Sequence, residues 1–160
     1  LIGGWAKRLF DAAPPGLTTL TAPMFPTLWD CGYGGLMFSR FTKLQHLTLT
    51  MAKETPKYVE TDHEEEEEDV VVDVGSTRAA QVTQVIQTVL ANLPLCSLSL
   101  RATSDFSFDS LELVSDTLEA FIVTGSNCGA YPTRYRCPKL KHVLFHGFSY
   151  GENIMGTRDW

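Results

Sequence analysis

The chain has 160 residues, of which 44% are hydrophobic, and it carries a formal net charge of −6 at pH 7. This length and composition suit one folded domain with a sizeable core and exclude disorder over the whole length. The sequence contains no run of about 18 apolar residues, which argues against a membrane-spanning helix, and no basic stripe of the kind that binds nucleic acid.

The positions of the charged residues and of the cysteines indicate what kind of protein this is. The net charge comes from seven acids between Asp62 and Asp69, interrupted only by His63, so the rest of the chain is nearly neutral. The four cysteines are widely spread and do not form a disulfide framework, which predicts a reducing, intracellular environment. The chain starts at Leu1 without a methionine or a signal peptide, so we expect it to be a fragment of a longer protein.

The N-terminal part predicts a short helix followed by a weak strand. Trp5, Leu9 and Phe10 fall on one stripe of a helix that a Pro-Pro-Gly sequence ends. The strand is predicted at residues 17–22 (LTTLTA), and an irregular crossing rich in Pro, Gly and aromatic residues is predicted from Pro23 to Gly35.

The next segment predicts a strand and then an interruption. Residues 44–49 (LQHLTL) form the strand, and residues 51–76 contain the acidic run. Like charges at this density repel one another and stay solvated, so we predict an acidic insertion loop over 51–76. Two alternatives remain at this stage: an additional strand around residues 70–74, and a role of the acids in binding a basic partner.

Residues 77–92 predict the clearest helix. Six apolar residues recur at i, i+3, i+4, i+7, i+8 and i+11 and share one helical face: Val82, Val85, Ile86, Val89, Leu90 and Leu93. Ser76 or Thr77 can cap the start of this helix, and Pro94 follows its end.

The C-terminal half predicts three strands separated by short connections. The strands are predicted at 95–100 (LCSLSL), 118–123 (LEAFIV) and 140–145 (LKHVLF). One or two helical turns are predicted within 109–115, and residues 125–139 are too rich in Gly, Pro and aromatic residues for a helix.

The predicted strands share the spacing L-x-x-L-x-L or an apolar variant of it. Their first leucines are 27, 51, 23 and 22 residues apart, and recurrence at about 20–29 residues is typical of leucine-rich repeats. In a strand the fourth and sixth positions of this motif point the same way, into the stack of units. We therefore predict an α/β fold over residues 1–160: an irregular leucine-rich-repeat solenoid with short parallel strands on its concave face and helices and loops outside.

One phrase carries a resemblance to a known family. CPKLKHVLFHG at 137–147 resembles the C-P-x-L-x-x-L-x-L opening of repeats in F-box proteins, and NLPLCSLSL and FTKLQHLTLT resemble variants of it. With its acidic insertion, the chain is similar to fungal F-box/leucine-rich-repeat proteins. The resemblance implies that the repeats hold a substrate protein for a ubiquitin ligase, while an F-box, not visible in this sequence, docks on the ligase adaptor. The alternative is a repeat segment that only braces a larger solenoid.

The outward positions of the predicted strands define a candidate protein-binding face. They are the third, fifth and seventh positions of each unit and form three rows: His46, Ser97, Ala120 and His142; Thr48, Ser99, Ile122 and Leu144; Thr50, Arg101, Thr124 and His146. Arg101 is the only fixed charge in these rows, and Ile122 and Leu144 form an apolar spot. Such a face suits a protein segment better than a nucleic acid, which requires many cations.

Two other outcomes are open for this face. It is either exposed to solvent without a partner or covered by the chain's own loops. The connections also contain aromatic residues that are typical either of an interface or of a plug at the edge of the stack: Phe106, Phe108, Tyr131, Tyr135, Phe148 and Tyr150.

The sequence predicts no catalytic, cofactor or metal site. Cys128, Cys137, His142 and His146 have the spacing C-x8-C-x4-H-x3-H, whereas structural zinc sites use tight cysteine pairs. Strand positions four residues apart are also about 13 Å apart, which is too far for one ion. The chain has neither a G-x-S-x-G sequence nor a glycine-rich phosphate loop. We therefore expect a binding module rather than an enzyme.

Overall fold

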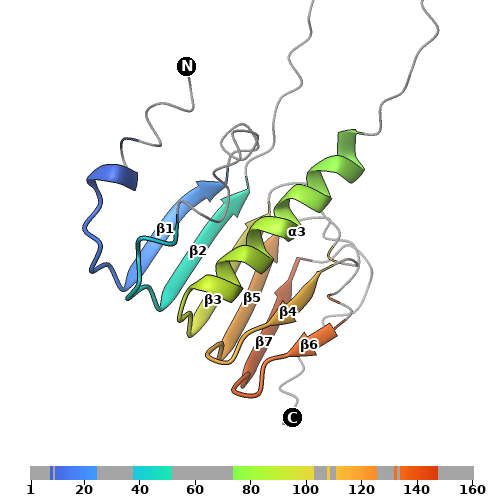
Figure 1. The fold of residues 1–160 in the computed structure, drawn as a ribbon. Coiled ribbons are helices and arrows are strands. Elements are labelled where there is room, and N and C mark those ends of the chain that lie inside the picture. The colour runs from blue at the N-terminus through green and yellow to red at the C-terminus, as the bar shows by residue number, and fades with distance from the viewer. Residues whose placement is uncertain are drawn as a thin grey trace, which may run out of the picture.

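The computed structural model describes residues 8, 10–24, 38–51, 74–102, 108, 111–125, 132 and 134–147, which form an α/β fold in two layers (Figure 1). One layer is an all-parallel sheet of five strands in the order β1-β2-β3-β5-β7. These strands are β1 (Thr19–Met24), β2 (His46–Met51), β3 (Ser97–Ala102), β5 (Ala120–Gly125) and β7 (His142–His146).

The second layer covers one face of this sheet. It contains the helix α3 (Val74–Asn92) and a small parallel sheet of β4 (Glu112–Val114) and β6 (Arg134–Arg136) (Figure 1). Among the described residues, no helix or strand covers the opposite face of the five-stranded sheet. The two faces therefore have different environments.

Four strands of the large sheet, β2, β3, β5 and β7, are each joined at their start to the preceding unit by the same backbone hydrogen bonds. Two consecutive N–H groups donate to one carbonyl oxygen of the unit before. Gln45 and His46 donate to the Thr18 carbonyl at 2.9 Å each, and the arrangement recurs with the carbonyls of Gln45, Cys96 and Glu119 as acceptors. This repeated corner aligns the units, so that residues at equivalent motif positions become neighbours across the sheet.

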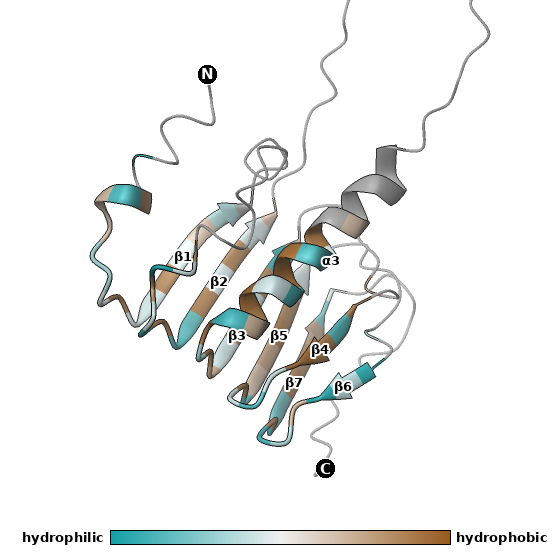
Figure 2. Ribbon diagram, viewed as in Figure 1, coloured by the Kyte–Doolittle hydropathy of each residue, from teal (hydrophilic) through white to brown (hydrophobic). Residues whose placement is uncertain are grey.

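The inward positions of the motif form the core. In β2, β3 and β5 the fourth and sixth positions are at most 1% exposed: Leu47, Leu49, Leu98, Leu100, Phe121 and Val123. They pack with the apolar face of α3 and with Leu113 of β4 in one cluster. Figure 2 shows brown bands that alternate with paler positions along β2. The face assignment made from L-x-x-L-x-L is thus confirmed in these three strands.

Arg40 contacts several segments near β1, at one end of the sheet. Its guanidinium donates hydrogen bonds to the carbonyls of Phe10 at 2.7 Å and Ala13 at 3.1 Å, and lies 5.5 Å from the centre of the Phe41 ring. Phe10 also packs edge-on against Phe38, with ring centres 5.3 Å apart. Arg40 therefore ties the N-terminal helical turn to the residues that lead into β2.

The boundaries of several predicted elements change in the structure. The helix predicted over 77–92 is confirmed and begins three residues earlier, at Val74. All five strands of the large sheet begin two residues after the leading leucine of their motif. In the corners before β2, β3, β5 and β7 this leucine is buried: Leu44, Leu95, Leu118 and Leu140. β1 continues through Pro23, which lacks an N–H group but is tolerated in a strand at the edge of a sheet.

Two predictions of local structure were wrong. Within the helical turns predicted over 109–115 the structure has β4 instead: Glu112–Val114 pairs with β6, and Leu111 and Leu113 are buried whereas Glu112 and Val114 are not. Cys96 lies just before β3 rather than within it, and it is half-buried.

The range predicted for the acidic insertion, 51–76, overlaps two elements of the structure: Met51 is the last residue of β2, and residues 74–76 belong to α3. The acidic run lies outside the described residues, as do residues 70–73 of the alternative strand predicted at 70–74, whereas Val74 is the first residue of α3. Trp5, Leu9 and four of the six loop aromatics also lie outside the described residues, while Phe108 is buried and Tyr135 belongs to β6.

Candidate recognition surface

The open face of the five-stranded sheet carries the candidate binding residues in three rows. The strand register aligns His46 with Ser97, Ala120 and His142; Thr48 with Ser99, Ile122 and Leu144; and Thr50 with Arg101, Thr124 and His146. We call these twelve residues the open face. The structure brings them together in the rows that the motif spacing predicts. β1 extends the rows with Thr19, Thr21 and Pro23, which the sequence analysis missed although LTTLTA has the same spacing.

No side chain of the open face is fully buried. The cationic and imidazole side chains His46, Arg101, His142 and His146 are exposed, and the remaining ones are half-buried by their neighbours within the rows. Strands about 4.8 Å apart bring adjacent side chains into contact and account for this partial burial. Every side chain of the open face therefore retains some contact with solvent.

The chemistry of the open face changes from β2 to β7. Its β2 and β3 half presents small hydroxyl side chains in the middle row, Thr48 and Ser99, whereas the β5 and β7 half presents Ile122 and Leu144. None of the three rows contains an acid. Small polar residues permit the backbone of a partner to approach closely, and the aliphatic pair offers apolar contact.

Three of the described basic side chains form ion pairs, whereas Arg101 does not. Lys141 contacts Glu119 at 2.9 Å, Arg134 contacts Glu112 at 3.2 Å, and Arg40 approaches Asp11 at 3.8 Å. Arg101 makes no ion pair with any residue that the structure describes, and its two neighbours in the row are Thr50 and Thr124. No described residue therefore neutralises its charge.

The ion pair between Glu119 and Lys141 lies at the start of β5 and β7, beside the open face. Both residues occupy the second position of their motif, and the hydrogen bond from Lys141 together with its charge lowers the pKa of Glu119. This pair links two neighbouring units at a motif position outside the three rows.

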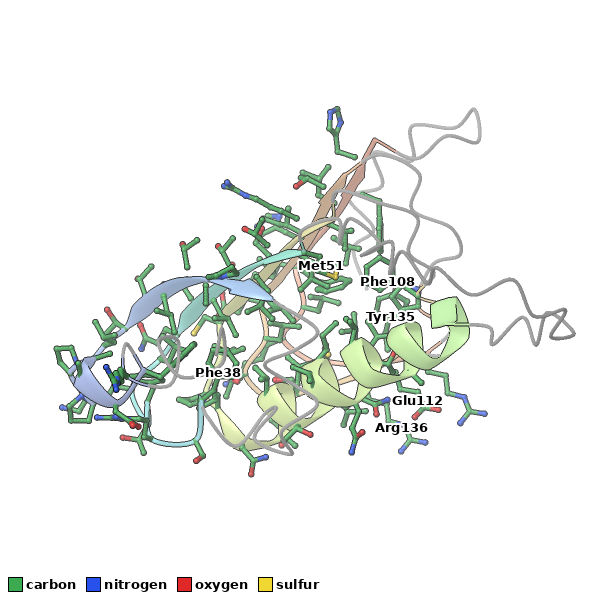
Figure 3. All side chains as sticks on the ribbon, turned by 90° about the horizontal axis from the view of Figure 1, so that it is seen from above. Phe38, Met51, Phe108, Glu112, Tyr135 and Arg136 are labelled. Carbon is green, nitrogen blue, oxygen red and sulfur yellow. The ribbon has the colours of Figure 1, made fainter. Side chains whose placement is uncertain are left out.

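A groove of about 630 Å³ lies in the other layer, between α3 and β4. It is lined by residues of the last turns of the helix and of the strand and corner that follow: Gln87, Leu90, Ala91, Leu93, Glu112, Val114, Ser115, Asp116 and Thr117. Val114, 49% exposed, is the one exposed large hydrophobic residue among those described. Figure 3 shows Glu112 and Arg136 on the same side of the molecule as α3. The sequence analysis missed this groove because it assigned 109–115 to helical turns.

The nucleophilic side chains of this layer have structural partners. The Cys137 thiol donates to the Leu113 carbonyl at 3.4 Å, and burial raises its pKa, which keeps it protonated. Ser115 Oγ accepts from the N–H groups of Thr117 and Leu118 at 3.3 and 3.2 Å, and Thr117 Oγ1 donates to Leu95 at 2.8 Å. These contacts build the corner before β5.

Neither a metal cluster nor a membrane-crossing helix occurs in the part of the chain that the structure describes. His, Cys, Asp and Glu do not gather there in groups of three or more that would suit an ion. α3 lacks the combination of length and apolar character that crossing a membrane requires. His142 and His146 lie on the same face of β7, as expected, and both are exposed.

The chain was compared with known protein families, curated proteins and solved structures. The chain matches no model of a known protein family, no curated protein and no solved structure.

Proposed function

We propose that the chain is a protein-recognition module of the leucine-rich-repeat type, and that the open face holds a segment of a partner protein. One observation carries this proposal. The outward side chains form three aligned rows across β2, β3, β5 and β7, and none of them is fully buried. A repeat fold of this kind separates a buried scaffold from an extended surface that is available for binding.

The composition of the open face favours a protein over a nucleic acid. A nucleic acid needs a series of cations along its phosphates, and the face supplies Arg101 as its single fixed charge. The neighbouring Ile122 and Leu144 are only half-buried, so a partner that covers them removes apolar surface from water. Hydroxyl and imidazole side chains surround this pair and can exchange hydrogen bonds with a peptide backbone.

A finer form of the proposal places the module in a ubiquitin ligase. It rests on the resemblance of CPKLKHVLFHG, NLPLCSLSL and FTKLQHLTLT to the repeats of F-box/leucine-rich-repeat proteins. In this form the partner is a substrate, and an F-box outside this sequence binds the ligase adaptor.

A second candidate function is purely architectural: the segment braces a longer stack of repeats. It is favoured by the position of β1 and β7 at the two edges of the sheet, because additional parallel strands can extend a sheet at its edges.

The test compares two double variants of the full-length protein in cells. Ile122→Glu with Leu144→Glu places charges on the open face, and Ala80→Glu with Gln84→Glu places the same charges on exposed positions of α3. We expect the first pair to lose the captured substrate and to retain the ligase adaptor, and the control pair to retain both.

Each form of the proposal has one result that would count against it. Substrate capture by the Ile122 and Leu144 variant would reject the open face as the binding surface. Absence of the adaptor from every preparation would reject the ligase. If no captured partner depends on the residues of the open face, the architectural function is the one that remains.

A further inference from the structure

The cationic and apolar contact points of the open face lie diagonally beside each other. Arg101 belongs to the last row of β3, and Ile122 belongs to the middle row of the adjacent strand β5, with Leu144 next to it on β7. Adjacent strands are about 4.8 Å apart, and successive rows are about 6.6 Å apart along the strands. The charge and the aliphatic pair are therefore separated by one strand and one row.

This separation matches the repeat of an extended peptide. Side chains at i and i+2 of an extended chain point to the same side and are about 6.6 Å apart, the same spacing as the rows. A peptide that lies along the strands, over the boundary between β3 and β5, can place one side chain on each of these two contact points. A peptide that crosses the strands would meet side chains about 4.8 Å apart, which does not fit its own repeat.

We propose that the open face binds an extended peptide segment in which an aliphatic residue and an anionic residue are two positions apart. The anionic group pairs with Arg101, and the aliphatic side chain packs on Ile122 and Leu144. This inference rests on the proposed protein-recognition function and specifies the chemistry of the segment that is recognised.

The surroundings of Arg101 support an anionic partner. Its exposed guanidinium has no ion pair among the described residues, and the flanking Thr50 and Thr124 supply hydroxyl donors. A guanidinium and a carboxylate or phosphate can form two parallel hydrogen bonds, which fixes the orientation of the bound group. A carboxylate and a phosphorylated side chain share this chemistry, and the experiment includes both.

The experiment starts from a displayed library of random 12-residue peptides, selected on the whole chain. With the unaltered protein we expect enrichment of an acidic residue two positions from Leu, Ile or Val. Arg101→Glu should select a basic residue at that position instead. The double variant Ile122→Thr with Leu144→Thr should lose the aliphatic preference and keep the acidic one. Thermal melts of the three proteins verify that each is folded.

Synthetic peptides then measure the spacing and the nature of the anion. We expect a peptide with the pair at i and i+2 to bind about tenfold more tightly than the same residues at i and i+1, because adjacent residues point to opposite sides of an extended chain. Replacing Glu by Gln should weaken binding about tenfold. Replacing Glu by phosphoserine distinguishes a phosphorylated partner, which binds more tightly than the Glu peptide, from an acidic one, which does not.

The outcomes separate this inference from the proposed function. An acidic preference that persists in Arg101→Glu, or binding indifferent to the spacing of the pair, overturns the inference. If the inference is overturned in this way but binding still depends on Ile122 and Leu144, the proposed function stands without the inference. A third outcome is binding that no open-face variant affects but that is lost in Val114→Asp. It would show that the peptides bind in the groove beside α3, and it would overturn both this inference and the proposed function of the open face.

Discussion

The two faces of the five-stranded sheet differ in what their residues do, although they alternate along the same strands. In β3, Leu98 and Leu100 point inward and are inaccessible to solvent, whereas Ser99 and Arg101 between and after them lie on the open face. Adjacent residues therefore belong to different surfaces. The inward residues pack the units together in the core, whereas the outward ones are exposed or half-buried. Stability and the proposed recognition should thus be altered separately by substitutions one position apart.

The largest contrast is expected between Leu98→Asp and Ser99→Asp. Burying a leucine contributes about 1.5–3 kcal/mol, and an unpaired carboxylate at that site adds a larger desolvation cost. Since a domain is stable by only about 5–15 kcal/mol, Leu98→Asp should abolish the cooperative thermal transition measured by circular dichroism. Ser99→Asp, on the open face, should shift the melting temperature only slightly. Equal losses in the two variants would show that the faces are assigned incorrectly.

A second large effect is expected where β5 and β7 end. Gly147 has a backbone φ of 88°, and a Cβ atom at this position would collide with the Gly125 carbonyl. Gly147→Ala combines this collision with a left-handed backbone conformation that costs about 1–3 kcal/mol on its own. We expect Gly147→Ala to lower the free energy of unfolding in urea by at least about 2 kcal/mol.

Gly16→Ala is the matched control for that measurement, because no atom lies within 4 Å of a Cβ built at Gly16 and its φ is not positive. Its stability should remain close to that of the unaltered protein. If the two alanine variants unfold at the same urea concentration, the close approach of the two strand ends does not limit the sequence at 147.

The sequence predicted the alternation of faces much better than it predicted the outer layer. The motif LCSLSL determines which residues of β3 are buried, since period-2 alternation depends only on neighbours in sequence. The same holds for α3, whose apolar face follows from six regularly spaced residues. These features are local, so a single sequence is sufficient to derive them.

The missed features depend on contacts between distant segments. β4 and β6 are strands of three residues each, too short to show a period, and they form only because Glu112–Val114 and Arg134–Arg136 lie side by side. The groove next to α3 depends on that pairing and was missed with it. The rows of the open face were predictable because motif spacing fixes the register between units, whereas the binding role of these rows remains a prediction.

A moderate effect is expected at the β1 end of the sheet. Arg40→Leu removes two hydrogen bonds to the carbonyls of Phe10 and Ala13. A hydrogen bond from a charged donor contributes about 1.5–3 kcal/mol when buried and less in this partly exposed position, so we expect a loss of about 1–2 kcal/mol in urea unfolding. Hydrogen exchange should accelerate in β1 before β5. Uniform acceleration throughout the sheet would instead show that Arg40 supports the whole fold rather than its end.

The smallest effect is expected from the ion pair beside the open face, and it should depend on pH. Lys141 lowers the pKa of Glu119 below its ordinary value of 4.5. A carboxyl whose pKa is lower in the folded state stabilises the fold above its unfolded pKa, and this contribution disappears as the pH falls through the folded value. Urea unfolding of the unaltered protein should therefore lose more stability between pH 6 and pH 3 than that of Glu119→Gln. Because both side chains are exposed, the difference should be small and should decrease in high salt. In Lys141→Met the same Glu119→Gln change should have a much smaller pH-dependent effect, since the side chain that lowers the pKa of Glu119 most is gone and only the weaker charges of Lys139 and His142 remain. A pH-dependent difference as large as in the unaltered protein would assign the effect to another group.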